Sequence, residues 1–294
     1  MGEARGGDDA GVRVEKKVDS RQLKVEGEKR ERRGKRKDNA ETQRAQRSTE
    51  RLIKDWRIKA LRSAGSAGER WTAQHEAARL ESARRAMIET QIERRGVRDA
   101  RVLSAMRAVP RHAFVPADLR AQAYEDAPLP IGGGQTISQP YMVAAMTAAL
   151  QLRGNERVLE VGGGCGYQAA VLAALAREVV TVEYRADLAA ATSARLAEMR
   201  YENIHVHCGD GTLGLPEMAQ FDAILVAAGA PAVPPPLLAQ LADGGRMVIP
   251  VGTLENQELQ LVERRRDTFQ TTVLDTCRFV PLIGAHGWKD LPLR

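Results

Sequence analysis

The feature that most constrains the fold is a regular alternation of short apolar strands and helices in the second half of the chain. Five segments have the length and near-continuous apolar character of buried strands: Arg157–Val161, Val179–Glu183, Ile204–Cys208, Phe221–Ala227 and Arg246–Val251. Helices are predicted between most of them, at Tyr167–Ala176, Asp187–Met199 and Pro235–Ala242. Buried strands that are connected through helices form a parallel sheet covered on both faces. The sequence therefore predicts an α/β protein with a mostly parallel, doubly wound sheet.

The segments that flank this alternation complete the predicted domain. Before it, apolar residues recur every three or four positions in two short helices that break at Gly96 and Pro110, and Pro140–Leu150 forms a third helix. After it, Glu258–Val262 and Thr271–Val280 lack helical spacing and are predicted to close the sheet as a C-terminal antiparallel strand pair.

The first 86 residues differ in composition from the rest of the chain. Residues 1–86 contain 24 Lys and Arg against 15 Asp and Glu, a net charge of +9, whereas residues 87–294 contain 20 against 23, a net charge of −3. Residues 1–50 have too little apolar surface to offset the entropy lost on ordering. We therefore predict a disordered basic N-terminal extension over 1–86 and a globular domain over 87–294. Met87 is a candidate translation start, and the extension is predicted to be dispensable for folding and activity.

Several classes of protein are disfavoured. The apolar run Met142–Leu150 is too short to span a bilayer, and no apolar stretch of a secretory signal follows Met1. The three cysteines lack C-x-x-C spacing, and His205 and His207 beside Cys208 have no matched third and fourth ligand, so no metal site is predicted. A cytoplasmic location without membrane contact follows as an expectation. The segment Arg51–Leu61 is either an amphipathic helix for a membrane, nucleic acid or protein partner, or a transient helix in a solvated tail.

A glycine-rich loop follows the first strand and opens directly into a helix, in Val161-Gly-Gly-Gly-Cys-Gly-Tyr167. Such a loop lets the backbone approach a ligand at a helix N-terminus. The spacing of Gly162, Gly164 and Gly166 fits an S-adenosylmethionine loop better than the dinucleotide pattern, which would start late relative to the strand end. A tight strand-to-helix turn without any ligand explains the same glycines.

Two acidic residues follow the next two strands. Glu183 closes the second strand, where a carboxylate can accept hydrogen bonds from both ribose hydroxyls, and Asp210 follows the third strand as a candidate partner for an adenine amino group. Each acid alone is commonly a solvated strand-end residue. Together with the glycine loop they favour a nucleoside-binding site at one edge of the sheet.

The segment Gln135-Thr-Ile-Ser-Gln-Pro140 makes the chain distinctive, because it resembles a segment that precedes the first Rossmann strand in the protein-L-isoaspartate O-methyltransferase family. The resemblance extends from about Met87 to Trp288. It includes Ala108–Phe114, Leu129–Gly132, Val158–Tyr167, Gly209–Gly211, Phe221–Ile224, Gly244–Arg246, Pro250–Gly252 and Phe279–Leu282. The departures are Gly163 and Cys165, where the family often has threonine and serine, and Ala227–Ala230 after the fourth strand.

The resemblance implies a Rossmann-like class I methyltransferase fold with S-adenosylmethionine as co-substrate and no metal. It implies methyl transfer to the α-carboxylate of L-isoaspartyl residues in damaged proteins and peptides. It also implies that Ser138 is essential and that the cofactor contacts Gln135, Thr136, Ile137, Ser138, Glu183, Asp210, Gly211 and Gln257, in addition to the loop glycines. By spacing alone, Ser138 would simply cap the helix that begins at Pro140.

The implied chemistry needs little proton transfer. A carboxylate is ionised at neutral pH and is already a nucleophile, and the sulfonium carries an activated leaving group. The site must orient one carboxylate oxygen, exclude water and offer neutral donors such as the Ser138 hydroxyl. Three alternatives remain: a methyltransferase for another substrate, a nucleic-acid-binding protein that acts through the basic extension, and a cofactor-binding scaffold without catalysis, against which Ser138, Glu183 and Asp210 argue.

Overall fold

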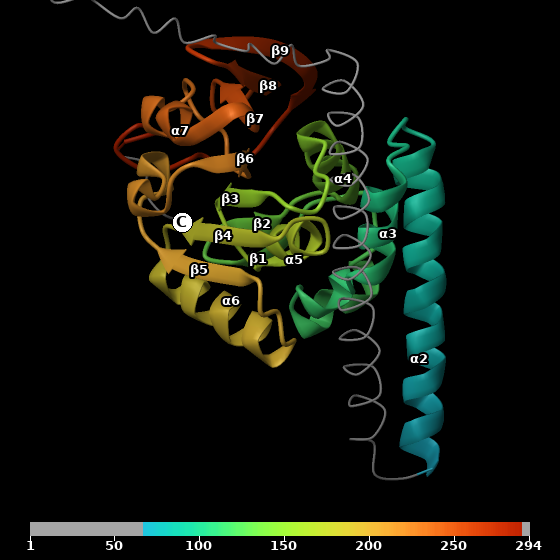
Figure 1. Ribbon diagram of the computed structural model, residues 1–294. Helices are drawn as coiled ribbons and strands as arrows, with labels where there is room; N and C mark the ends of the chain where they lie inside the picture. Colours follow the sequence, from blue (N-terminus) through green and yellow to red (C-terminus); the bar gives the residue numbers. More distant parts are fainter. Residues whose placement is uncertain (1–66, 290–294) are drawn as a thin grey trace, which may run out of the picture.

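A seven-stranded sheet in the order β5-β4-β3-β6-β7-β8-β9 forms the centre of the structure, a computed structural model that describes residues 67–289 (Figure 1). The strands are β3 (Arg157–Val161), β4 (Glu178–Glu183), β5 (Ile204–Cys208), β6 (Phe221–Val226), β7 (Leu241–Gly252), β8 (Gln257–Arg265) and β9 (Thr268–Cys277). Strands β3 to β7 pair in parallel, and β7, β8 and β9 pair antiparallel. The predicted α/β class with a closing antiparallel pair is confirmed.

Helices cover both faces of this sheet, and the side chains of each strand alternate between two buried cores. Val158 and Val179 point into the core beneath helices α3 to α5, whereas the adjacent Leu159 and Val180 point into the core beneath α7. The helices are α3 (Ala100–Ala108), α4 (Pro140–Leu150), α5 (Tyr167–Ala173), α6 (Ala186–Glu198) and α7 (Pro235–Gln240). Short 3-10 turns lie at η2 (Arg111–Ala113), η3 (Ala117–Gln122), η4 (Gly211–Leu213) and η5 (Pro216–Met218).

The structure differs from the sequence-based elements mainly at their ends. The helix predicted to Ala176 ends at Ala173, and the one predicted to Ala242 ends at Gln240 because Leu241 already belongs to β7. A small antiparallel hairpin, β1 (Leu129–Gly132) and β2 (Gln135–Ile137), occupies a segment for which the sequence predicted neither a helix nor a strand. Its two-residue turn needs positive φ angles, which Gly133 and Gly134 provide at 59° and 71°.

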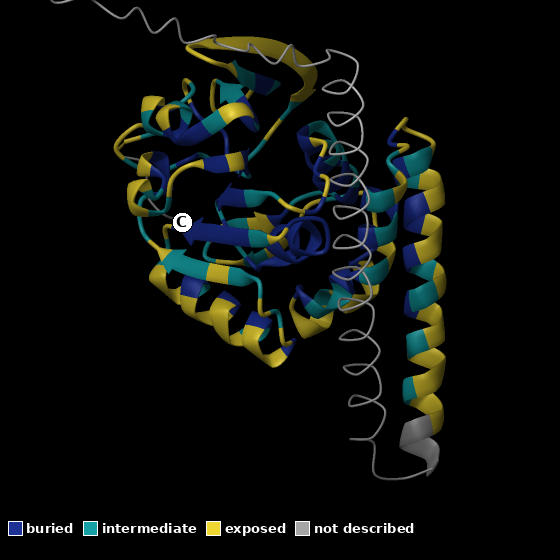
Figure 2. Cartoon of the chain, in the orientation of Figure 1, coloured by how far each residue is buried: buried dark blue, intermediate teal, exposed yellow. Residues whose placement is uncertain are grey.

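The N-terminal part of the described chain is a helix, although it falls in the predicted extension. Helix α2 (Ala67–Ala86) continues into a π-helical turn, η1 (Met87–Glu93). Figure 2 shows α2 as exposed along most of its length, but Leu80 and Arg84 are buried, and Arg84 Nη1 donates a hydrogen bond to the Ala108 carbonyl oxygen at 3.4 Å. Packing therefore begins before Met87. The residues before 67, including Arg51–Leu61, lie outside the described residues. None of the described helices is long and apolar enough to cross a membrane.

This packing allows the domain boundary to be tested. A chain that begins at Met87 loses the buried side chains of Leu80 and Arg84, which we expect to cost about 2 kcal/mol of unfolding free energy and about 4–8 °C in Tm. A chain that begins at residue 67 keeps both and should match the full chain in Tm and in kcat/KM for a neutral isoaspartyl peptide. Calorimetry of the three chains measures this, and equal Tm values for all three would leave Met87 as the boundary.

Candidate functional site

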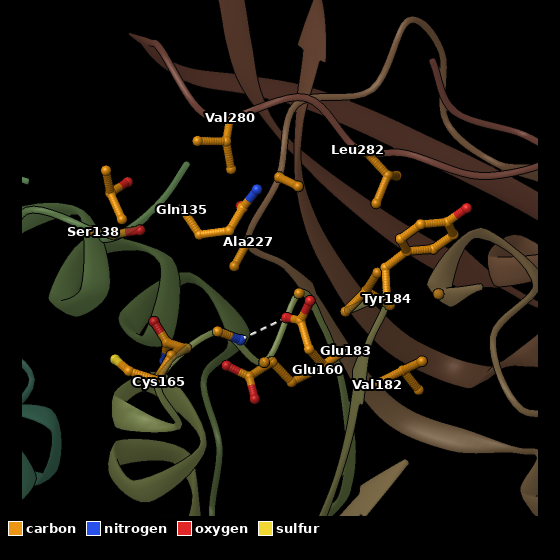
Figure 3. Close-up of a pocket in the computed structure, with 18 of the residues that line it drawn as sticks. Gln135, Ser138, Glu160, Cys165, Val182, Glu183, Tyr184, Ala227, Val280 and Leu282 are labelled. Carbon is orange, nitrogen blue, oxygen red and sulfur yellow. Dashed lines mark hydrogen bonds between the residues drawn. The ribbon is translucent and has the colours of Figure 1, made fainter. Parts of the chain in front are cut away.

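A pocket opens at the carboxyl ends of β3, β4 and β6, the point where the strand order reverses: the chain runs outward from β3 to β4 and β5 and then crosses back to β6 on the other side of β3. Parallel α/β sheets bind ligands at such a switch point. Its wall includes the residues of β2 and just after it, the glycine loop after β3, the end of β4, the residues that follow β6, and the C-terminal segment 280–283 (Figure 3).

Most of the predicted site residues meet at this pocket, although they are far apart in the sequence. Those that line it are Gln135, Thr136, Ile137, Ser138, Gly162, Gly164, Glu183 and Gly211. Gly166, Asp210 and Gln257 do not line it.

The glycine loop is held in a conformation that favours glycine. Gly162, Gly164 and Gly166 have φ angles of 91°, 52° and 85°, in the left-handed region. Gly166 is the N-cap of α5, and a Cβ atom there would lie 2.8 Å from the Thr192 side chain. The loop backbone is fixed further because the Thr192 hydroxyl donates a hydrogen bond to the Gly164 carbonyl oxygen.

Glu183 connects the end of β4 to this loop. One of its carboxylate oxygens accepts a hydrogen bond from the Gly164 amide at 2.8 Å, the dashed line in Figure 3, and the other accepts from the Arg185 amide at 2.9 Å. The side chain is buried, but it borders the pocket. Since a carboxylate oxygen can accept more than one hydrogen bond, both oxygens retain acceptor capacity toward a ligand.

Asp210 and Gln257 both hold the C-terminal segment that forms one wall of the pocket. The Asp210 carboxylate accepts hydrogen bonds from the Thr212 amide at 2.9 Å and from the Ala285 amide at 2.7 Å. The buried Gln257 side chain accepts from the Phe279 amide at 2.7 Å and donates to the Thr253 carbonyl oxygen at 3.1 Å. In this structure these two side chains position the wall rather than border the pocket.

Ser138 does not cap the neighbouring helix. Helix α4 has Gln139 as its N-cap and no side-chain capping bond. The half-buried Ser138 side chain lines the pocket, and its hydroxyl forms no hydrogen bond with another residue in the described part of the chain. The hydroxyl is therefore available to a ligand in the pocket.

Glu160 is a site residue that the sequence interpretation missed. It is the last residue but one of β3, lines the pocket, and is fully buried, and neither carboxylate oxygen has a hydrogen-bond partner among residues 67–289. The pKa of Glu160 is raised to about 8, chiefly by burial and to a smaller extent by the nearby charge of Glu183, while the neighbouring Thr181 hydroxyl opposes the shift. The available signal was a carboxylate inside an otherwise apolar strand, where an acid is costly unless it has a partner. At this position the Glu160 carboxylate could pair with a cationic group of a ligand in the pocket.

The structure shows the surroundings of Gly163 and Cys165, the two loop residues that depart from the family's usual threonine and serine. A Cβ atom on Gly163 would lie 2.6 Å from the Thr181 hydroxyl oxygen, so Thr181 on β4 occupies the space that a larger residue at position 163 would need. Cys165 is buried, and burial raises the pKa of its thiol, so the side chain is neutral at physiological pH. Both positions therefore leave the loop without added charge.

The histidines of β5 do not form part of a larger ligand set. His205 Nε2 lies 3.5 Å from a carboxylate oxygen of Glu178. No group of three or more His, Cys, Asp or Glu side chains among the described residues is placed to hold a metal ion.

Comparisons with known proteins agree on one family. The sequence profile described as Protein-L-isoaspartate(D-aspartate) O-methyltransferase (PCMT) matches residues 82–287. A Protein-L-isoaspartate O-methyltransferase 1 of Syntrophobacter fumaroxidans is 54% identical over 210 residues, which cover 71% of this chain and 98% of the relative. A Protein-L-isoaspartate O-methyltransferase of Roseiflexus castenholzii is 57% identical over 205 residues, covering 70% of this chain and 94% of the relative.

Two solved structures have the same fold. One, a protein-L-isoaspartate O-methyltransferase, has a TM-score of 0.63 and 29% identity and covers 71% of this chain and 67% of its own. The other is a putative protein-L-isoaspartate O-methyltransferase from Plasmodium falciparum in complex with S-adenosyl-L-homocysteine. It has a TM-score of 0.59 and 24% identity, with coverage of 69% of this chain and 97% of its own.

Proposed function

Because this chain belongs to the protein-L-isoaspartate O-methyltransferase family, we propose that its pocket is the site where this protein repair enzyme binds S-adenosylmethionine and methylates damaged proteins. The methyl group goes to the α-carboxylate of an L-isoaspartyl residue. One observation supports this assignment of the pocket. Ser138, Glu183 and the glycine loop come from three separate segments of the chain, yet all of them line the same pocket.

The polar groups of the pocket fit S-adenosylmethionine. Glu183 is placed to accept hydrogen bonds from the ribose hydroxyls, as a strand-end acid does in nucleoside sites. The cofactor also carries an ammonium group, and the buried Glu160 carboxylate lacks a partner among the described side chains. We assign Glu160 to that ammonium group, since pairing the two charges would offset the cost of burying the carboxylate.

The reaction requires positioning more than proton transfer. The isoaspartyl carboxylate attacks the methyl carbon, the carbon–sulfur bond breaks, and its electrons remain on sulfur as the neutral thioether. Charge is consumed as anion and cation combine, so a neutral donor stabilises the arrangement better than a fixed charge close to the carboxylate would. Ser138 supplies such a hydroxyl at the pocket wall and orients the carboxylate oxygen that does not react. The family resemblance implies that the methyl ester then cyclises to a succinimide.

The wall formed by residues 280–283 closes the pocket on its other side. Asp210 and Gln257 hold this wall through the Ala285 and Phe279 amides, so we propose that they support the cofactor site indirectly. This differs from the direct contacts that the resemblance implies for both residues.

The decisive experiment combines binding with activity. Isothermal titration should show binding of S-adenosylmethionine and S-adenosylhomocysteine but not of NAD. With labelled S-adenosylmethionine, the enzyme should methylate an isoaspartyl peptide and leave the matched aspartyl peptide unlabelled. Binding of NAD alone would contradict the proposed cofactor, and labelling of both peptides would contradict the proposed substrate.

Nucleic-acid binding through the basic extension remains a separate prediction, because residues 1–66 lie outside the described residues. Filter binding across a salt series, with the full chain and a chain beginning at residue 67, tests it. An affinity for nucleic acid that falls as the salt concentration rises, and that is lost in the chain beginning at residue 67, would support this prediction.

A further inference from the structure

Strand β9 leaves one edge of the central sheet unpaired in the part of the chain that the structure describes. It follows β8 at the end of the strand order, and its side chains are exposed from Thr268 to Thr276. Figure 2 shows this as a continuous exposed band. Three of the large apolar side chains exposed on the described surface lie on this strand: Phe269, Val273 and Leu274, which are 41%, 52% and 42% exposed. An unpaired strand of this kind presents a row of free N–H and C=O groups.

The opposite edge of the sheet is protected, but β9 lacks the usual protective features. Strand β5 is only five residues long, and helix α6 packs against it. Strand β9 has ten residues, no proline, no lysine or arginine, and a single charged residue, Asp275. Its Thr, Val, Leu and Phe residues favour strand pairing. Natural sheets normally guard such an edge with charge, proline or a covering segment.

The charges near the two ends of β9 have opposite signs. At the β8–β9 turn lie Arg264, Arg265 and Arg266 with Asp267 and with Asp243, whose carboxylate accepts a hydrogen bond from the Arg266 amide, a net charge of +1, while Glu263 beside them is paired with Arg246. At the other end lie Glu255, Glu258 and Asp275 with Arg278, a net charge of −2. Two such strands placed antiparallel would bring each positive end beside a negative end. Two strands placed parallel would bring like charges together.

We propose that β9 pairs with β9 of a second copy of this chain, antiparallel and across a two-fold axis, to form a dimer with one sheet continuous through both subunits. The free backbone groups provide the hydrogen bonds, the exposed apolar side chains are partly covered, and the charge layout selects the antiparallel direction. The pocket lies at the carboxyl ends of β3, β4 and β6, and its wall at residues 280–283 follows β9 without belonging to the pairing edge, so we expect methyl transfer not to depend on dimerisation.

Sedimentation of the full chain at rising concentration tests the proposal directly. The mass should rise from 32.2 kDa toward twice that value as the protein approaches a few hundred micromolar, and hydrogen exchange of residues 268–277 should slow in parallel. Val273→Lys should weaken the dimer at least tenfold, because it places like charges across the pairing edge. Ala190→Lys, on the exposed face of α6, is the matched control and should dimerise like the wild type.

A charge pair tests the direction of pairing. Arg265→Glu with Arg266→Glu should weaken the dimer because it reverses the sign of the charge at the turn, and adding Glu255→Arg with Asp275→Arg, which reverses the sign at the other end of β9, should restore it. Thr272→Lys is a second edge variant, and unchanged Tm and methyl transfer in each variant show that it folds. A monomer throughout the concentration range would overturn the proposal, as would a dimer that Val273→Lys and Thr272→Lys leave intact. Slowed exchange of β9 only on adding an extended peptide, with the mass still monomeric, would instead assign the edge to peptide binding.

Discussion

Replacing Ser138 with alanine should lower kcat on an isoaspartyl peptide by about 100- to 1,000-fold, which corresponds to about 2.7–4 kcal/mol for one oriented donor at a reacting group. The affinity for S-adenosylmethionine should change little. The physical reason is that the Ser138 hydroxyl lines the pocket without a partner among the described residues and does not cap helix α4, so its hydrogen bond is available to the substrate carboxylate. Single-turnover kinetics separates the chemical step from binding.

The control for this substitution is Ser104→Ala, a half-buried serine on α3 that does not line the pocket. It should leave kcat unchanged. If Ser138→Ala lowered Tm and left kcat intact, the serine would have a structural role and the proposed orientation of the carboxylate would be wrong.

Replacing Glu160 with glutamine should stabilise the free protein and weaken its binding of S-adenosylmethionine. The pKa of Glu160 is raised from 4.5 to about 8 in the folded chain. Between these two values the folded state holds a proton that the unfolded state has released, so the wild type loses stability as pH rises, by about 1.4 kcal/mol per pH unit at most. Glutamine has no such titration. We expect a gain of about 2–4 kcal/mol at pH 8 and almost none at pH 4.5.

The same substitution removes the charge that we assign to the cofactor ammonium, so affinity should fall by about 10- to 100-fold. Calorimetry from pH 5 to pH 9 and titration with S-adenosylmethionine measure the two effects. Glu202→Gln, at an exposed position, is the matched control and should alter neither. Equal Tm differences at pH 5 and pH 9 would show that Glu160 is not a buried proton-binding group, and unchanged affinity would remove it from the ammonium site.

The sequence alone determined the class of fold, because strand periodicity is a local property. Arg157–Val161 and Ile204–Cys208 are strands with the bounds that their apolar character predicts. The glycine spacing after β3 and the segment Gln135–Pro140 identified the family, and the comparisons confirm it. Such features can be recognised without knowledge of the fold, since a strand, a glycine turn and a motif each depend on residues that are close along the chain.

Only the tertiary structure decided what each polar side chain contacts. Asp210 follows β5 and Gln257 begins β8, yet their side chains accept hydrogen bonds from the amides of Ala285 and Phe279, which are 75 and 22 residues away in the chain. The buried Glu160 and the packing of Leu80 and Arg84 likewise depend on distant segments. The hydrogen bonds and the burial of a side chain depend on which segments meet in space. The local pattern that predicts a strand or a helix does not specify those distant segments.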